Sequence, residues 1–321
     1  MRFLVVGAGA IGGYFGGRLL EAGRDVTFLV RPGRAEQLAA TGLAIRSPRG
    51  NADLPAPTVL ADRLHDAFDV VLLSCKAYDL DAAMDALAPA VGAGTAILPL
   101  LNGMRHLDTL DARFGADRVL GGACLISATL DAEGRIIHLN DSDGLVFGER
   151  GGGRSARVEA IAAAFAGARF DGRLSEAILQ EMWEKWVFIA TLAGITTLMR
   201  ATLGDVVASG GAALAASLLD ECAAVAARQG FAPRADWMAG TRRFFGAPGA
   251  FVAASMLRDI ERGARPEADQ ILGDLLRRAG AEPERDAPLL RLAVAHAKAY
   301  EARREREQTQ RGAPVSGGYT G

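Results

Sequence analysis

After Met1 and Arg2 the chain reads Phe3-Leu4-Val5-Val6-Gly7-Ala8-Gly9-Ala10-Ile11-Gly12, an apolar run that leads directly into a G-x-G-x-x-G sequence. The apolar run predicts a buried strand, and the residues beyond the glycines have the periodicity of a helix. In this strand–turn–helix context the motif is typical of dinucleotide-binding proteins. The alternative is a glycine-rich turn that holds no ligand.

Each glycine of the motif has its own part in binding a pyrophosphate. Gly7 permits the tight turn, Gly9 lets the pyrophosphate approach the backbone, and Gly12 lets the helix pack closely on the strand. The N-terminus of the helix adds free N–H groups and the positive end of its dipole. The residues predicted to bind the cofactor here are Gly7, Gly9, Ala10, Ile11 and Gly12.

The first half of the chain alternates short apolar runs with helical patterns, which indicates a parallel sheet covered on both faces. The predicted strands are Phe3–Val6, Val26–Val30, Val70–Ser74 and Ala96–Leu98, and the predicted helices are Ile11–Ala22, Ala35–Ala40 and Leu80–Ala88. Three further strands, Val119–Ser127, Arg135–His138 and Gly144–Phe147, are expected at a more antiparallel end of the same sheet, with a turn at Glu133-Gly134. An Ala-rich helix is expected near Arg157–Ala166.

From about Ser175 the pattern becomes almost entirely helical. The predicted helices are Ser175–Met199, Val206–Gln229, Asp236–Phe244, Pro266–Ala279 and Ala287–Arg306. Ser175 suits an N-cap, and Pro266 suits a first helical position. The predicted fold is therefore α/β, with a Rossmann-like dinucleotide-binding domain over residues 1–174. An all-helical C-terminal domain is expected over 175–308, followed by a mobile tail over 309–321.

Composition excludes several classes of protein. The 321 residues carry 36 Lys and Arg against 38 Asp and Glu, a net charge of −2, which argues against binding nucleic acid through bulk positive charge. The uncharged stretch Trp186–Met199 is too short to span a membrane, and the glycines after Val6 do not suit a signal peptide. We therefore expect a cytoplasmic protein with neither a nucleic-acid nor a membrane partner.

The cysteines and histidines do not suggest a metal site. Three cysteines are too few and too widely spaced for a disulfide framework or a zinc cluster, and they are expected to be buried thiols in a reducing compartment. The four histidines lack metal-ligand spacing and a nucleophile partner, so we interpret them as structural. These residues are Cys75, Cys124 and Cys222, and His65, His106, His138 and His296.

The end of the second strand favours NADPH over NADH. An acidic residue about 20 positions beyond the glycine loop would bind the ribose 2′-hydroxyl. Here the strand ends in Arg31, with Arg34 three residues later, and a guanidinium suits a 2′-phosphate. Lys76, after the third strand, is a second candidate for the phosphates. The alternative for Arg31 and Lys76 is a solvated charge at a strand end.

Two residues are candidates for the reaction. Asn102 follows the fourth strand, where its amide could orient a nicotinamide or a substrate; it could equally be a turn residue. Lys185 shares a helix face with apolar residues, and an ammonium in such a place needs a partner or a task. It could pair with Glu181 on the surface, or donate a proton to a substrate oxygen. The apolar residues of that face are Ile178, Met182, Ile189, Leu192 and Ala193.

Ser255, Asp259 and Glu267 form a second polar set. Ser255 could cap a helix. Glu267 follows Pro266 and could stabilise the dipole of the next helix from its first turn.

Together these residues resemble the ketopantoate reductase (2-dehydropantoate 2-reductase) family, and the similarity extends to about residue 300. The residues that carry it are the glycine loop, Arg31, Cys75-Lys76-Ala77, Leu101-Asn102-Gly103, Lys185, Ser255-Met256-Leu257-Arg258-Asp259 and Glu267. The resemblance implies NADPH-dependent reduction of the 2-oxo acid 2-dehydropantoate to pantoate, on the pathway to pantothenate. It also implies a homodimer, since members of the family are often dimers.

The resemblance assigns a role to each matching residue. Lys185 would hydrogen-bond the ketone oxygen and protonate the developing alkoxide, where a preorganised cation stabilises the transition state. Glu267 would bind the primary hydroxyl of the substrate. Ser255 would hold its carboxylate, and Asn102 would position cofactor and substrate.

The chain departs from the family at three positions. Ile189, Ala193 and Leu203 stand where known members carry asparagines, so the polar lining for ketopantoate is thinner. One hypothesis is that Arg200 replaces them as the carboxylate anchor. The substrate therefore stays open between ketopantoate and another 2-oxo acid or an imine, and a third alternative is a dinucleotide-binding sensor without turnover.

Overall fold

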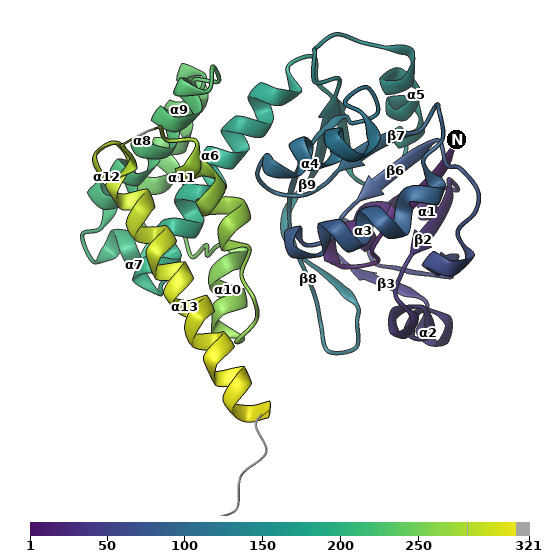
Figure 1. The fold of residues 1–321 in the computed structure, drawn as a ribbon, viewed down its shortest axis with the longest axis horizontal. Helices are drawn as coiled ribbons and strands as arrows, with labels where there is room; N and C mark the ends of the chain where they lie inside the picture. The colour runs from purple at the N-terminus through teal and green to yellow at the C-terminus, as the bar shows by residue number, and fades with distance from the viewer. Residues whose placement is uncertain (281, 313–321) are drawn as a thin grey trace, which may run out of the picture. The chain divides into compact units, whose positions relative to one another are not determined.

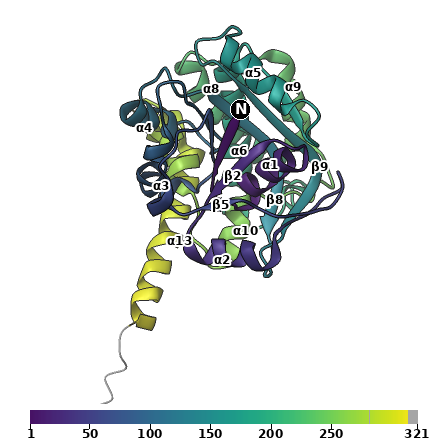
Figure 2. The same cartoon turned by 90° about the vertical axis from the view of Figure 1, so that its right-hand side faces the viewer.

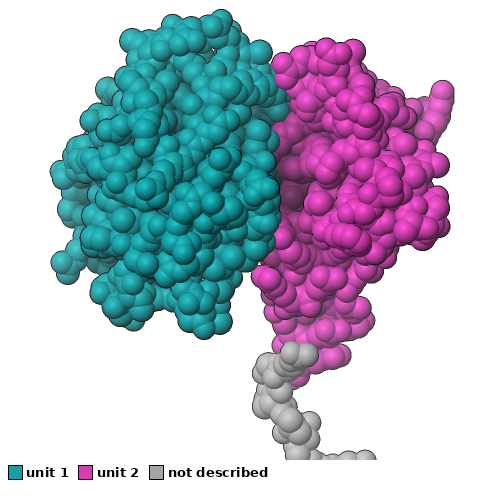
Figure 3. All heavy atoms as spheres, turned by 180° about the vertical axis from the view of Figure 1, so that it is seen from behind, with its two compact units in different colours: residues 1–182 teal, residues 183–321 magenta. Residues whose placement is uncertain are grey.

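The computed structural model describes residues 1–280 and 282–312, and the chain forms two compact units. The first unit is Met1–Met182 and the second begins at Trp183 (Figure 3). The sequence-based boundary, after residue 174, lies just before helix α6 (Ile178–Met199), and the division between the units lies inside that helix. Within the described residues, no helix combines the length and apolarity needed to cross a membrane.

The first unit contains a five-stranded parallel sheet in the order β5-β2-β1-β6-β7. Figure 1 labels β2, β6 and β7 of this sheet. Its strands are β1 (Arg2–Val6), β2 (Asp25–Leu29), β5 (Thr58–Val59), β6 (Val70–Leu73) and β7 (Ala96–Pro99). The four strands predicted from apolar runs are confirmed. Because the order reverses on the two sides of β1, the carboxyl ends of β1 and β6 form the switch point at which such sheets bind ligands.

The helices of the first unit follow the predicted alternation. They are α1 (Ala10–Glu21), α2 (Pro32–Thr41), α3 (Leu80–Leu87), α4 (Arg105–Phe114) and α5 (Ala156–Phe165), with short 3-10 turns at Ala61–Arg63, Ala77–Asp79 and Ala88–Ala90. Strands and helices therefore alternate as a βαβ fold requires.

The prediction of an antiparallel end to the first sheet is wrong, because those strands form a second sheet. Its order is β10-β9-β3-β4, and β8 pairs antiparallel with β9. The strands are β3 (Leu43–Arg46), β4 (Ala52–Leu54), β8 (Gly121–Leu130), β9 (Ile136–Gly148) and β10 (Asp171–Leu174). The predicted strands Arg135–His138 and Gly144–Phe147 form one strand, β9. The polar residues between them resemble a turn in the sequence, but Asp143 is buried and accepts a hydrogen bond from Tyr14 at 3.0 Å.

Helix α1 packs closely against residues of both sheets, and its glycines make this possible. A Cβ on Gly16 would lie 2.8 Å from the side chain of Val5 in the first sheet. A Cβ on Gly13 would lie 2.6 Å from Ile136 in the second sheet. The high glycine content near the N-terminus therefore serves helix packing as well as the turn before α1.

The second unit is helical, as predicted (Figure 2). It contains most of α6, then α7 (Leu203–Ala208), α8 (Ala212–Arg228), α9 (Ala235–Gly246), α10 (Ser255–Glu261), a π-helical segment (Asp269–Gly273), α11 (Asp274–Arg277), α12 (Pro283–Asp286) and α13 (Pro288–Gly312). Ser175, the predicted N-cap, accepts the N–H of Ala177 on its Oγ at 3.1 Å just before α6.

Three boundaries in the second half differ from the prediction. The helix expected over Val206–Gln229 is broken before α8, where Gly210 adopts a φ of +88°. Pro266 and Glu267 precede their helix instead of opening it. Helix α13 extends to Gly312 and so includes residues 309–312 of the predicted tail, and residues 313–321 lie outside the described part.

Candidate functional site

The turn between β1 and α1 has the form that a dinucleotide requires. Gly7 adopts a φ of +93°, and its N–H donates to the carbonyl of Leu29 at 2.9 Å. Gly9 is the N-cap of α1 and has no side chain with which to cap the first turn. A Cβ on Gly9 would meet nothing within 4 Å. The backbone at Gly9 therefore borders open space beside a helix N-terminus, which is a suitable place for a phosphate.

Ser74, which is not a predicted site residue, holds this turn in place. It follows β6, and its hydroxyl donates to the carbonyls of Val6 at 2.9 Å and Gly7 at 3.1 Å. A Cβ on Gly12 would lie 2.0 Å from Ser74 Oγ and 2.3 Å from the carbonyl oxygen of Gly7. Gly12 is thus required for helix packing, whereas Gly9 leaves room for a ligand.

Arg31 lies at the end of β2 as the N-cap of α2, and its side chain is 76% exposed. Its Nη2 is 2.9 Å from Oδ1 of Asp79. An exposed pair of this kind contributes only about 0–1 kcal/mol, so the guanidinium can exchange the carboxylate for a phosphate at little cost.

Lys76 and Asn102 follow β6 and β7, which are neighbours of β1 in the parallel sheet. Both side chains are half-buried. Because the carboxyl ends of parallel strands share one edge, the fold brings these two residues to the edge that holds the glycine turn. The expectation that all three cysteines are buried is wrong for Cys75, which is half-buried beside Lys76.

In the second unit, Lys185 and Glu267 lie on elements that contact each other through Ile271. Lys185 is half-buried on α6, and the next residue, Trp186, donates its Nε1–H to the carbonyl of Ile271 at 2.8 Å. The N–H of Ile271 in turn donates to the carbonyl of Glu267 at 3.0 Å. The turn of α6 that carries Lys185 and the segment that begins at Glu267 are therefore held together.

The π-helical segment after Glu267 was not predicted. Glu267 precedes the first helical residue and accepts an early hydrogen bond of that segment through its carbonyl, so the expectation that it lies inside the first turn is wrong. A π-helical turn widens the helix and is frequent at functional sites. Its position directly after Glu267 marks this end of the segment as a site candidate.

An ion pair between a buried carboxylate and a largely exposed arginine, which the sequence did not predict, fixes the turn of α6 next to Lys185. Glu184 is 2% exposed and accepts hydrogen bonds from the backbone N–H and the Nε of Arg234, both at 2.9 Å. Arg234 is the N-cap of α9. This pair joins α6 to the start of α9 and restricts rotation of α6 at the position of Lys185.

Ser255 and Arg200 are placed near the C-terminal end of α6, beyond Lys185. Ser255 is the exposed first residue of α10, and the N–H of its neighbour Ala254 points to Thr196 Oγ1 at 3.4 Å. Arg200 follows the last residue of α6 and is about 22 Å along the helix axis from Lys185, at 1.5 Å per residue. The backbone link through Ile271 joins Glu267, and not Arg200, to the turn of α6 that carries Lys185.

The three departures from the family pattern differ in exposure. Ala193 and Leu203 are buried in the core, at 1% and 0% exposed. Ile189, one turn after Lys185, is half-buried. Of the three positions, Ile189 is thus the one that gives α6 an accessible apolar surface beside Lys185.

Comparison with known proteins assigns a family to this architecture. A family model described as "Ketopantoate reductase PanE/ApbA" matches residues 3–152, and the model of the C-terminal part of that family matches residues 177–301. The chain is 40% identical over 303 residues to the uncharacterized oxidoreductase YkpB of Bacillus subtilis, covering 94% of this chain and 99% of that protein.

Two further relatives carry more specific names. A 2-dehydropantoate 2-reductase of Mesorhizobium japonicum is 30% identical over 297 residues, covering 85% of this chain and 89% of that protein. The crystal structure of a PanE/ApbA family ketopantoate reductase from Ralstonia eutropha superimposes with a TM-score of 0.84 at 25% identity, covering 95% of this chain and 100% of that one.

Proposed function

The chain belongs to the ketopantoate reductase family, and on that premise we propose that it reduces a 2-oxo acid with NADPH, 2-dehydropantoate being the first candidate substrate. The observation that carries the proposal is the link through Ile271 between the turn of Lys185 and Glu267. A chain that only senses a dinucleotide has no physical need for an acid and a carboxylate in that arrangement.

The residues of the first unit fit a nicotinamide dinucleotide. The uncapped N-terminus of α1, with open space beside Gly9, suits the diphosphate. Arg31 would exchange Asp79 for the 2′-phosphate, Lys76 would add a second cation, and Asn102 would orient the nicotinamide and the substrate. When bound, the cofactor supplies the hydride.

Lys185 and Glu267 act on the substrate in this proposal. The ammonium of Lys185 donates a hydrogen bond to the ketone oxygen and then delivers a proton to it as negative charge develops. Because Lys185 is half-buried, its charge is less screened by water than on an open surface. Glu267 accepts a hydrogen bond from the hydroxyl of ketopantoate, and Ser255 is the donor for its carboxylate. Arg200 is left out because of its distance along α6.

A second candidate substrate is a 2-oxo acid with an apolar chain, or the corresponding imine. Ile189 favours it, because a half-buried isoleucine beside Lys185 would contact a hydrocarbon group better than a hydroxyl. The two candidate substrates differ in whether they carry the hydroxyl group that would donate a hydrogen bond to Glu267.

The test follows NADPH absorbance with ketopantoate and with 3,3-dimethyl-2-oxobutanoate, which lacks only the hydroxyl. Ketopantoate is expected to have the higher kcat/KM, and Glu267→Ala should remove most of the difference. Lys185→Met should lower kcat by about 100-fold or more while NADPH still binds. Binding of NADPH without turnover of any oxo acid or imine would favour the sensor instead.

A further inference from the structure

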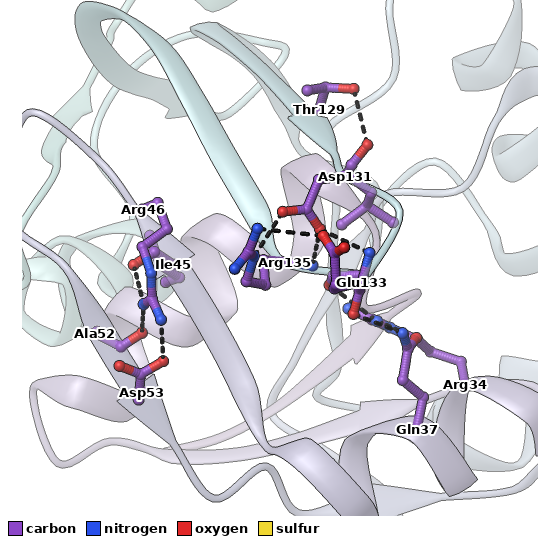
Figure 4. A network of polar contacts seen from close by, with 12 residues as sticks. Arg34, Gln37, Ile45, Arg46, Ala52, Asp53, Thr129, Asp131, Glu133 and Arg135 are labelled. Atoms are coloured by element: carbon purple, nitrogen blue, oxygen red, sulfur yellow. Dashed lines mark hydrogen bonds and ion pairs between the residues drawn. The ribbon is translucent and has the colours of Figure 1, made fainter.

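Arg34 connects three parts of the first unit. It lies in the first turn of α2, and its Nε donates to the carbonyl of Ala8, inside the glycine turn, at 3.1 Å. Its Nη1 donates to Gln37 Oε1 at 2.6 Å and to the carbonyl of Gly134, at the tip of the β8–β9 hairpin, at 3.1 Å (Figure 4). The guanidinium therefore ties the hairpin tip to the turn that would hold the phosphates.

The hairpin tip is shaped to support this arginine. Gln37 donates its Nε2 to the carbonyl of Glu133 at 2.8 Å, next to the contact of Arg34 with Gly134 (Figure 4). Gly134 has a φ of +76°, and a Cβ there would lie 2.6 Å from Arg34 Nη1. Only glycine fits this position without displacing the arginine.

The charge of Arg34 has no carboxylate partner among the described residues. The acids nearest in the hairpin, Asp131 and Glu133, pair with Arg135 instead, at 2.6 Å and 3.2 Å. Arg34 Nη2 is buried and makes no hydrogen bond within the described part of the chain. Burial also lowers the pKa of Arg34, because it penalises the charged form. A desolvated cation without a counter-charge is costly unless an anion arrives nearby.

The geometry of the guanidinium directs this free donor toward the glycine turn. In arginine the Nε–H and one Nη2–H point to the same side of a rigid plane. Since Nε faces the carbonyl of Ala8, Nη2 lies on that side as well. The residue after Ala8 is Gly9, which borders the open space described above.

We propose that Arg34 is a positioning residue for dinucleotide binding: it holds the Ala8 carbonyl and the hairpin tip in one arrangement, and it places an uncompensated positive charge beside the phosphoryl groups of the bound dinucleotide. The hairpin tip, far from the glycine turn in sequence, is thereby part of the cofactor site. This inference rests on the proposed function, because it presumes that the chain binds a dinucleotide.

The test measures the Kd of NADPH and of NADH by isothermal titration calorimetry. Arg34→Met should weaken binding by about 10-fold, because it removes a positive charge near the phosphates and the bond to the Ala8 carbonyl, and Arg34→Lys should weaken it by less. Gln37→Leu leaves the charge but removes its support and should weaken binding several-fold. The matched control is Arg46→Met: Arg46 pairs with Asp53 at 2.8 Å and has no contact with the glycine turn (Figure 4).

The salt dependence of dinucleotide binding separates the effect of the charge of Arg34 from the effect of its structural contacts. The ratio of the Kd values of Arg34→Met and the wild type should shrink between about 0.05 M and about 0.5 M salt, because the charge is then screened. A larger loss with NADPH than with NADH places the effect at the 2′-phosphate, and equal losses place it at the diphosphate; both support the proposal. Unchanged Kd values in Arg34→Met and Gln37→Leu would overturn it. A wild-type chain that binds neither dinucleotide would overturn the proposed function as well.

Discussion

At the scale of single residues, the chemistry depends on how α6 presents Lys185. The adjacent Glu184 is buried and bonded to Arg234, so one side of the helix turn is fixed while Lys185 itself stays half accessible. A residue that must donate a proton in one geometry benefits from such an anchor, because small displacements of a catalytic group lower the rate steeply.

Glu184→Ala should therefore destabilise the protein by about 1–3 kcal/mol, because it removes the buried acceptor of the Arg234 backbone N–H and side chain. Urea unfolding followed by circular dichroism measures the change. The control is Glu176→Ala, whose carboxylate is 63% exposed and 3.8 Å from Arg154. It should change stability by about 0.5 kcal/mol or less, and a similar loss in both variants would contradict the account of Glu184.

Arg200 carries a backbone strain that a glycine would relieve. Its φ is +52°, and the N–H of Ala201 donates back to the carbonyl of Thr196 at 3.2 Å, as in a Schellman cap. Arg200→Gly should stabilise the protein by about 0.5 kcal/mol, since the left-handed conformation costs arginine more than the added chain entropy costs glycine. The same change at Arg303, inside α13, should destabilise by about 1 kcal/mol.

The kinetics of Arg200→Gly test the carboxylate-anchor hypothesis independently. If Arg200 lies outside the substrate site, Arg200→Gly leaves KM for each oxo acid unchanged. A rise in KM for every substrate would show that Arg200 belongs to the substrate site.

At the scale of elements, the β1–α1 turn separates two uses of glycine that one motif contains. Gly9 borders open space, whereas Gly12 is in contact with Ser74 and the Gly7 carbonyl. Gly9 is needed for binding a ligand, and Gly12 is needed for the fold itself.

Gly9→Ala should leave stability within about 0.5 kcal/mol of the wild type and weaken NADPH binding, because its Cβ enters only the open space. Gly12→Ala should destabilise by about 1–3 kcal/mol through overpacking. Thermal unfolding and dinucleotide titration of both variants check this. A stable Gly12→Ala chain, or a Gly9→Ala chain with full affinity, would contradict the assignment.

How far the sequence predicts these elements depends on their burial. The central parallel strands, such as Val70–Leu73, are buried throughout and appear as apolar runs. The second sheet lacks that signal: β10 reads Asp-Gly-Arg-Leu and is mostly exposed, and β9 has polar residues at its centre. Neither periodicity nor composition distinguishes the π-helical segment from an ordinary helix.

Prediction of the candidate site from the sequence has the same limit. Arg31, Lys76 and Asn102 were predicted because each follows a recognisable strand. Glu184, Ser74 and the contacts of Arg34 depend on pairing between distant segments, so a single sequence gives no sign of them.

At the scale of the whole molecule, the proposal gives the two compact units different roles. The first holds the groups for the dinucleotide, and the second holds Lys185 and Glu267. Family resemblance predicts a homodimer, and sedimentation equilibrium should then give twice the 33.6 kDa of the chain at micromolar concentration. A mass of one chain at every concentration would contradict this.

The most direct test of the central claim is the fate of the hydride. NADPH deuterated at the transferable C4 position is incubated with the chain and ketopantoate, and the product is examined by mass spectrometry. The account predicts pantoate carrying one deuterium at C2, and loss of that product in Lys185→Met although NADPH still binds. A 2-hydroxy acid without deuterium at C2, or undiminished formation of labelled pantoate by Lys185→Met, would contradict it.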